Sequence, residues 1–441
     1  MKNIFKNKFL ITIIQLITFF ILPYSLVWAQ DSADYYESQY LRYEDFIYHQ
    51  NIKTVLLSHP DFELSSPIIR FNTEDKLLLT FDDLDGDVKD YSYTFIHCNA
   101  NWTPSDLLYS QYISGLPDDR ITDYSFSFNT LQPYTHFRLL FPDNSVKPLI
   151  SGNYLLLVFS EGNRNNIILT KRFMMADAKV NIEAAVHRAS VIDDRNSKQK
   201  IDFSVFYNSY NIDNPFGDVN VVLMQNDRWD NAITTLKPLF LRSTQLDYTY
   251  ESGNDFNGGN EYRTFDTRSL RFLSERVSKI NTDSARNSVF IQPDESRSYQ
   301  RYVTEYDLNG YYVVKTYDGR NDEIESDYVY VHFLLPYEVQ RTDGNFYVFG
   351  TLSNNHCLPE NKMIYDSEES SYKATLLLKQ GYYNYIYVFL PDNSGAADET
   401  VIEGNHYETE NDYTILVYHR PTASRYDHLV GIKKLNSMKT Y

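Results

Sequence analysis

Alternating hydrophobic and polar positions recur along most of the chain. Residues 180–187 and 201–207 place apolar side chains at every second position, which is typical of half-buried β-strands. Residues 154–159 are continuously apolar, as in a strand buried on both faces. Further strands are predicted at residues 219–224, 329–335, 346–349, 373–378 and 413–418. Turn signals such as Asp85-Gly86 and Asp343-Gly344 separate these runs, so the pattern predicts an all-β protein of tandem immunoglobulin-like (E-set-like) β-sandwich domains.

Changes in this pattern divide the chain into consecutive blocks. One sheet ends near residue 177 and a new strand follows, while Leu335-Pro336 closes a second block. We therefore predict an N-terminal domain at 30–177, a middle domain at 178–336 and a C-terminal domain at 337–441. Residues 251–301 are expected to form long loops of the middle domain. The segment 270–280 fits either helical or strand spacing.

The first 29 residues have the three parts of a secretory signal peptide. Lys2, Lys6 and Lys8 precede an apolar run at 9–22, and Val27 and Ala29 are small residues before a cleavage site. The run is shorter than the roughly 20 residues that span a bilayer, which favours cleavage after Ala29 over a membrane anchor. No cysteine stands directly after the run, at the cleavage site, which excludes a lipid anchor at a mature N-terminus at residue 30. We expect an exported protein with no membrane span.

Composition supports the β assignment and narrows the partners. The 39 tyrosines and 27 phenylalanines suit pleated, half-buried surfaces. A formal net charge of −18 disfavours nucleic acid and anionic lipid as partners and favours a basic protein surface. The two cysteines, Cys98 and Cys357, fall in different predicted domains. They are interpreted as buried thiols, with a disulfide across a domain contact as the alternative.

Three groups of residues could bind a metal or carry out catalysis, and each also has a simpler structural interpretation. The acidic segment 82–87 offers oxygen ligands for calcium but lacks EF-hand spacing, and a solvated turn is preferred. His97 and Cys98 are strand neighbours that point to opposite faces, so they are interpreted as a buried thiol beside a surface or hydrogen-bonded imidazole. His406, Glu408 and Glu410 alternate along one segment, where a polar edge is preferred over a hydrolase site.

The aromatic segment 382–389 presents a row of tyrosines on one face. An exposed row of this kind stacks on sugar rings, whereas a buried row fills a sandwich core, and the core is preferred. No nucleotide-binding or nucleophile-elbow motif is present. The sequence thus predicts no enzyme, no cofactor and no metal site.

Five segments in a fixed order carry a resemblance to a known family. They are residues 95–105 (FIHCNANWTPS), 225–232 (QNDRWDNA), 258–266 (GGNEYRTFD), 378–385 (LKQGYYNY) and 403–413 (EGNHYETENDY). Together they resemble the plug protein of the type 9 secretion system of Bacteroidetes, formerly a domain of unknown function, over residues 40–431.

The resemblance implies a periplasmic protein that docks on the giant outer-membrane β-barrel translocon and seals its periplasmic opening. It also implies a monomeric component of a hetero-complex. Because interface energetics are dominated by arginine and aromatic residues, we predict partner contacts within two of these motifs. The candidates are Arg228, Trp229, Asn260, Glu261, Arg263 and Asp266. The structural alternative packs Trp229 in a core and pairs Arg263 with Asp266 or Glu261 inside a loop.

Two other functions stay open at this point. The C-terminal block also resembles the accessory sandwiches found beside starch-acting enzymes, which would make the protein an exported carbohydrate-binding module. The second is a hydrolase acting through His406, Glu408 and Glu410. A glycan array discriminates the first from a plug, and alanine substitution of the three residues discriminates the second.

Overall fold

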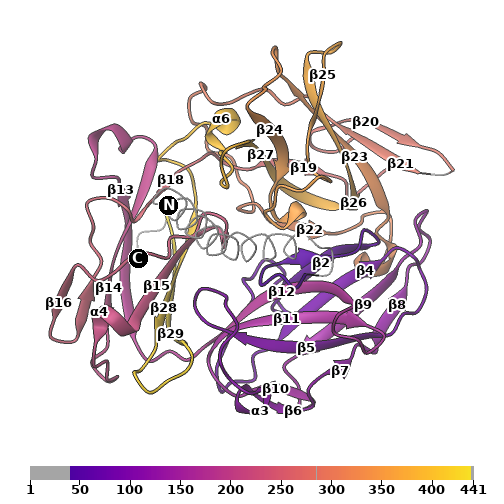
Figure 1. The fold of residues 1–441 in the computed structure, drawn as a ribbon. Helices are drawn as coiled ribbons and strands as arrows, with labels where there is room; N and C mark the ends of the chain where they lie inside the picture. Colours follow the sequence, from indigo (N-terminus) through magenta and orange to yellow (C-terminus); the bar gives the residue numbers. More distant parts are fainter. Residues whose placement is uncertain (1–39, 285, 439–441) are drawn as a thin grey trace, which may run out of the picture.

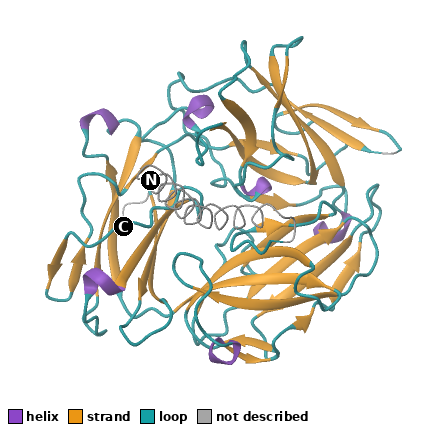
Figure 2. Cartoon of the chain, viewed as in Figure 1, coloured by secondary structure: helices purple, strands orange, loops and turns teal. Residues whose placement is uncertain are grey.

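Three β-sandwiches make up the computed structural model, which describes residues 40–284 and 286–438 (Figure 1). Strands and loops dominate the described residues, whose helices are single turns (Figure 2). All strands predicted from periodicity are present, and the immunoglobulin-like sandwich class is confirmed. The ambiguous segment resolves into turns followed by a strand at Val277–Thr282. The predicted signal peptide lies outside the described residues.

The first sandwich uses residues 46–176. One sheet has the order β1-β12-β11-β5-β7, with β3 parallel to β12, and the facing sheet has the order β2-β4-β9-β8. A short pair, β10-β6, lies at one end. The bounds are β1 Phe46–Ile47, β2 Ile52–Ser58, β3 Ile68–Arg70, β4 Leu77–Asp83, β5 Tyr91–Cys98, α3 Tyr109–Tyr112, β6 Ile113–Gly115, β7 Asp119–Arg120, β8 Asp123–Phe126, β9 Thr135–Phe141, β10 Val146–Pro148, β11 Gly152–Ser160 and β12 Ile167–Ala176.

The second sandwich combines strands from two distant parts of the chain. The sheet β13-β14-β17-β16, with β18 also on β14, faces the sheet β15-β28-β29. In Figure 1 the yellow strands β28 and β29 lie beside β15. The bounds are β13 Asn181–Arg188, η1 Ile192–Asp194, β14 Lys198–Phe206, α4 Pro215–Asp218, β15 Val219–Gln225, β16 Phe240–Arg242, β17 Gln245–Asp247, β18 Asp255–Asn257, β28 Asp412–His419 and β29 His428–Asn436.

The third sandwich occupies the chain between these two parts. Strand β27 pairs with β19, β22 and β24, and it faces the sheet β20-β21-β23-β26-β25. The bounds are β19 Arg263–Asp266, β20 Val277–Thr282, β21 Asn287–Ile291, β22 Tyr312–Val314, α5 Asp322–Glu325, β23 Tyr328–Pro336, β24 Gly344–Phe349, η2 Thr351–Ser353, β25 Ile364–Asp366, β26 Ser371–Lys379, β27 Gly381–Pro391 and α6 Thr400–Glu403.

This strand pairing differs from three consecutive blocks divided at 177 and 336. The change near residue 177 coincides with the end of β12. Strand β23, however, pairs with β26 across residue 336, and β15 pairs with β28 about 190 residues further along the chain. Periodicity reveals that a segment is a strand, but it contains no information about which strand lies beside it. The third sandwich is therefore an insertion in the second.

Each sandwich has its own aromatic core, and a further apolar cluster joins the first sandwich to the second. That cluster combines Cys98, Trp102 and Leu155 with Met224 and Leu416. The aromatic segment predicted at 382–389 is β27, whose Tyr383, Tyr385 and Tyr387 are fully buried, as the preferred interpretation expected.

Candidate functional site

Three of the five motif segments, residues 225–232, 258–266 and 403–413, meet where the second and third sandwiches join. Residues 225–232 follow β15 and residues 258–266 lead from β18 into β19. Residues 378–385 connect β26 to β27, and residues 403–413 lead from α6 into β28. Because β15 and β28 belong to the second sandwich and β19 to the third, the first, second and fourth of these segments form the junction. Residues 378–385 pair with β19 inside the third sandwich, and their Lys379 reaches Asp82 of the first.

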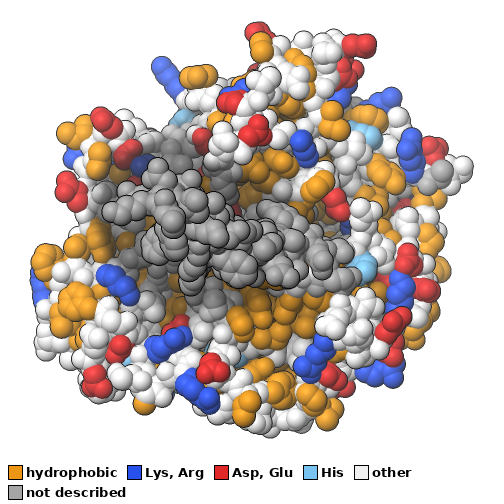
Figure 3. Space-filling model, viewed as in Figure 1, with side chains coloured by type: hydrophobic (Ala, Val, Ile, Leu, Met, Phe, Trp, Pro, Cys, Tyr) orange, Lys and Arg blue, Asp and Glu red, His pale blue; other side chains and the backbone are white. Residues whose placement is uncertain are grey.

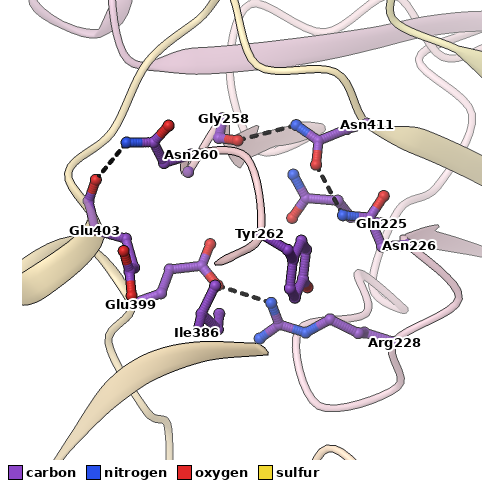
Figure 4. Close-up of a pocket in the computed structure, with 11 residues that line it drawn as sticks. Gln225, Asn226, Arg228, Gly258, Asn260, Tyr262, Ile386, Glu399, Glu403 and Asn411 are labelled. Carbon is purple, nitrogen blue, oxygen red and sulfur yellow. Dashed lines mark hydrogen bonds and ion pairs between the residues drawn. The ribbon is translucent and has the colours of Figure 1, made fainter. Parts of the chain in front are cut away.

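A small cavity of about 10 Å³ lies at the centre of this junction (Figure 4). A space of this size is at the lower limit for one water molecule, so the junction has no room for an organic ligand. Amide, carboxylate and guanidinium groups converge on it from both sandwiches (Figure 4). It is lined by Gln225, Asn226, Arg228, Gly258, Gly259, Asn260, Tyr262, Ile386, Glu399, Glu403 and Asn411.

Arg228 connects the two sandwiches by ion pairs. Its guanidinium is 5% exposed and lies 2.7 Å from Glu399 Oε2 and 2.7 Å from Asp230 Oδ2. Burial acts to lower the pKa of Arg228, but these two carboxylates outweigh it and raise that pKa well above its ordinary value. The side chain is thus occupied inside the molecule.

Arg263 lies at the centre of a second buried network. Its Nη1 is 2.9 Å from Asp294 Oδ1 and its Nε is 3.0 Å from Glu403 Oε1. Asp294 also accepts hydrogen bonds from Tyr385 and Tyr387 at 2.5 and 2.8 Å. The expected pairing of Arg263 with Asp266 or Glu261 is wrong, because the partners come from segments distant in sequence.

The other predicted partner contacts are also internal. Asn260 donates to the carbonyl of Glu403 at 2.8 Å, and Glu261 accepts from the amide of Glu410 at 3.1 Å. Asp266 pairs with Arg268 at 2.7 Å. Arg228, Glu261, Arg263 and Asp266 are buried and paired inside the molecule, so a partner would not reach them in this conformation. Of the ion pairs described here, Arg228–Glu399 joins two sandwiches, whereas Arg263 and Asp266 pair within the third.

Trp229 and Trp102 pack edge to face at 5.2 Å, and Arg172 lies over both rings at 4.5 and 5.2 Å. Trp102 belongs to the motif at residues 95–105, so this motif meets residues 225–232 at the interface of the first two sandwiches. The core role considered for Trp229 therefore holds, in a cluster between domains.

Asp227 was not among the predicted site residues, yet it contacts all three sandwiches. Its carboxylate accepts hydrogen bonds from Ser66 of the first sandwich, from Tyr311 of the third at 2.8 Å and from Thr414 of the second at 3.0 Å. It lines a hollow of about 120 Å³ at the meeting point of the sandwiches, together with Val55, Arg172 and Met224. Its place inside the QNDRWDNA motif was the available signal.

The acidic segment 82–87 separates into two environments. Asp83, Asp85 and Asp87 come together, and the ammonium of Lys89 lies 2.9 Å from Asp83 Oδ2 and also contacts Asp85. A lysine thus supplies the positive charge at the place where calcium was considered. Asp82 differs from the solvated turn that was predicted, since it is fully buried and pairs with Lys379 of the third sandwich at 2.7 Å.

The remaining candidates for chemistry are separated or inert. Cys98 and Cys357 are free, and burial raises the pKa of each thiol to about 12. Burial lowers the pKa of His97 to about 4, and its Nδ1 lies 2.9 Å from Ser105 Oγ. Glu410 is bonded to Asn436, and Glu408 is exposed, so these carboxylates do not form a paired site with His406.

Comparison with known proteins gives the family. Residues 52–177 match the model of the type 9 secretion system plug protein first domain. A crystal structure of a hypothetical protein from Parabacteroides merdae ATCC 43184 superimposes with a TM-score of 0.87 at 33% identity, covering 90% of this chain and 100% of that one. No curated protein matches the chain significantly.

Across residues 40–284 and 286–438, no helix has the length and apolar character required to cross a membrane. The matched model covers the first sandwich, and the related structure extends the likeness over the other two. The chain belongs to the type 9 secretion system plug protein family.

Proposed function

We propose that this protein is a non-enzymatic periplasmic plug, which docks on the outer-membrane translocon of the type 9 secretion system and seals its periplasmic opening. The observation that carries the proposal is the match of the first sandwich to the plug protein model, in a chain that follows one related structure over 90% of its length. Cleavage after Ala29 would accompany export, and sequencing of the mature N-terminus tests that step.

Rigid joints between the sandwiches support such a role. A seal has to keep its shape when it is loaded from one side, and multi-domain chains are expected to move unless their interfaces are large and apolar. Here an apolar cluster joins the first and second sandwiches, and buried ion pairs join the third sandwich to both others. Buried contacts thus link each sandwich to the other two.

The surface supports reversible docking. Acidic and basic side chains are interspersed around the face seen in Figure 3, and the chain as a whole carries a formal charge of −18. Interfaces of this polar kind form quickly and weaken with salt when the partner has the opposite charge. A basic rim on the translocon is the complement that this charge predicts.

The test is affinity purification of the tagged protein from detergent-solubilised outer membranes, followed by mass spectrometry. We expect one very large β-barrel protein, in smaller yield when secretion substrates fill the channel and at higher salt. Recovery of sugar-processing proteins without such a barrel would reject the proposal.

No structural observation favours the carbohydrate-binding alternative. That alternative came from the likeness of the C-terminal block to accessory sandwiches beside starch-acting enzymes. The row of tyrosines that could have stacked on sugar rings is buried in the core of the third sandwich, at Tyr383, Tyr385 and Tyr387. A glycan array with the purified protein remains the direct measurement, and binding there would reopen that alternative.

A further inference from the structure

Strand β8 is an edge of the first sandwich with free main-chain groups. It ends the sheet order β2-β4-β9-β8 and pairs only with β9 among the described strands, and Figure 1 shows it as the outermost strand of its sheet. All four of its residues are exposed. Natural edge strands are usually blunted by shortness, charged residues, proline, a bulge or a covering segment. Strand β8 has four residues and begins with Asp123, but it contains no proline, lysine or bulge. Beyond it, the N–H of Phe128 already donates to the carbonyl of Ile324 in the third sandwich at 2.9 Å.

The register shows which backbone groups of β8 are free. Ser127 donates to the carbonyl of Tyr134 at 2.8 Å just beyond the strand. In an antiparallel ladder, hydrogen-bonded and non-bonded pairs alternate, so Ser125 and Asp123 exchange hydrogen bonds with β9. The N–H and C=O groups of Tyr124 and Phe126 consequently point away from β9, toward the open edge.

The side chains of the same two residues face the core side of the sheet. Tyr124 lies opposite Phe137, a fully buried core residue, with ring centroids 5.7 Å apart. Phe126 packs on Tyr124 at 6.0 Å. Tyr124 is nevertheless 39% exposed and Phe126 53%, so the aromatic core of this sandwich opens to solvent at β8.

These two features define the shape of the missing neighbour. Free donors and acceptors spaced along an edge are satisfied by another main chain in extended conformation, which also positions its alternate side chains over the open core. The Asp123 carboxylate, 71% exposed and 3.8 Å from Arg138, favours a basic residue on that neighbour. A formal charge of −18 on each copy disfavours a second copy of this chain as the neighbour.

We propose that β8 is a docking edge that accepts an extended strand from the translocon, with apolar residues at alternate positions and a basic residue near Asp123. This inference rests on the proposed plug function, because that function supplies the partner. Strand addition would seat the first sandwich by main-chain hydrogen bonds, and would order a segment of the partner along the open side of its core.

The test combines a photo-crosslinker with edge substitutions in the full-length protein in its own cells. A benzophenone amino acid replaces Phe126, and crosslinked products are identified by mass spectrometry. In parallel, Phe126→Pro removes an outward N–H at a position where edge strands tolerate proline. The variant Tyr124→Lys/Phe126→Lys keeps the backbone and blocks the edge with like charge toward a basic strand. Leu241→Pro, in the exposed edge strand β16 of the second sandwich, is the matched control.

We expect crosslinks to an extended segment of the large barrel, and capture of the barrel at least about tenfold lower for both edge variants. Leu241→Pro should capture as the wild type does. Thermal unfolding of the purified variants checks that each is folded. Wild-type-like capture by folded edge variants, or crosslinks to a second copy of this chain, would overturn the docking edge while leaving the plug proposal intact. Failure of the wild-type protein to capture any barrel would overturn the plug proposal and this inference with it.

Discussion

Lys379 and Asp82 form an ion pair that is buried between the first and third sandwiches. The ammonium lies 2.7 Å from the carboxylate, and His136 and Tyr328 bond to the same carboxylate at 2.6 and 2.7 Å. Burial acts to raise the pKa of Asp82, but Lys379 and His136 outweigh it and hold that pKa below its ordinary value. Burial lowers the pKa of Lys379, and the nearby Asp82 carboxylate opposes this lowering only in part. Each charge is therefore stable in this buried position only while the other is present.

Substitution of Lys379→Met should lower the free energy of unfolding by about 3 kcal/mol or more, because it leaves a buried carboxylate without its cation. The measurement is denaturant-induced unfolding monitored by circular dichroism. Lys373→Met is the control, since Lys373 pairs with Asp366 and Glu369 at the surface and its loss should cost about 0–1 kcal/mol. Equal losses in the two variants would show that the buried pair contributes little.

Asp307 gives a pH dependence at the junction of the second and third sandwiches. Burial raises the pKa of Asp307 to about 7, although the amides of Tyr262 and Asn309 donate to it; Glu261 and Glu410 add further negative charge nearby. Its proton binds more tightly in the folded state than in the unfolded state. Its contribution to stability is therefore complete below the ordinary pKa of 3.8 and is lost as the pH rises through about 7.

The variant Asp307→Asn should show a flatter dependence of unfolding free energy on pH between about 4 and 7 than the wild type. Unfolding midpoints across that range, compared as a difference between the two proteins, measure it. Parallel profiles would mean that Asp307 is ionised throughout the range in the folded protein.

At the scale of elements, the motif loops at the junction are held by close backbone contact. A Cβ on Gly258 would lie 2.0 Å from the carbonyl oxygen of His406, so only glycine allows the segments 258–266 and 403–413 to approach as they do. The obstructing oxygen belongs to the backbone and not to a flexible side chain that could move aside.

Gly258→Ala should therefore force these two segments apart and cost about 2 kcal/mol, seen as a lower thermal unfolding midpoint. Gly395→Ala serves as the comparison, because no heavy atom lies within 4 Å of its added Cβ. An unchanged midpoint for Gly258→Ala would show that the loops adapt without cost.

At the scale of the whole molecule, the insertion of one sandwich into another determines which fragments of the chain can fold by themselves. Residues 178–336 contain β15 without β28 and β23 without β26, so two sheets lack a central partner. Residues 178–441 contain every strand of both sandwiches.

We expect residues 178–441 to unfold cooperatively on heating and residues 178–336 to show no cooperative transition. Circular dichroism and the dispersion of amide signals in NMR spectra distinguish the two. A folded 178–336 fragment would mean that β15 and β23 find other partners when the C-terminal strands are absent.

The sequence by itself determined the class of the fold and the positions of most strands. Alternation at 180–187 and the continuous apolar run at 154–159 were sufficient, because the period of a strand is local and is written in neighbouring residues. The resemblance of the five motifs to the plug family was likewise recognisable from the sequence. The roles of the residues in those motifs were not.

Only the tertiary structure decided which strands pair and which charged residues are buried. Asp82 and Asp85 lie in the same acidic run, yet Asp82 is buried against Lys379 and Asp85 is exposed beside Lys89. Arg228 and Arg263 were predicted at a partner surface, and they form ion pairs with Glu399 and Glu403, 140 or more residues away. Contacts at such separations depend on how whole sheets pack, and no local pattern of hydrophobic and polar positions records that packing.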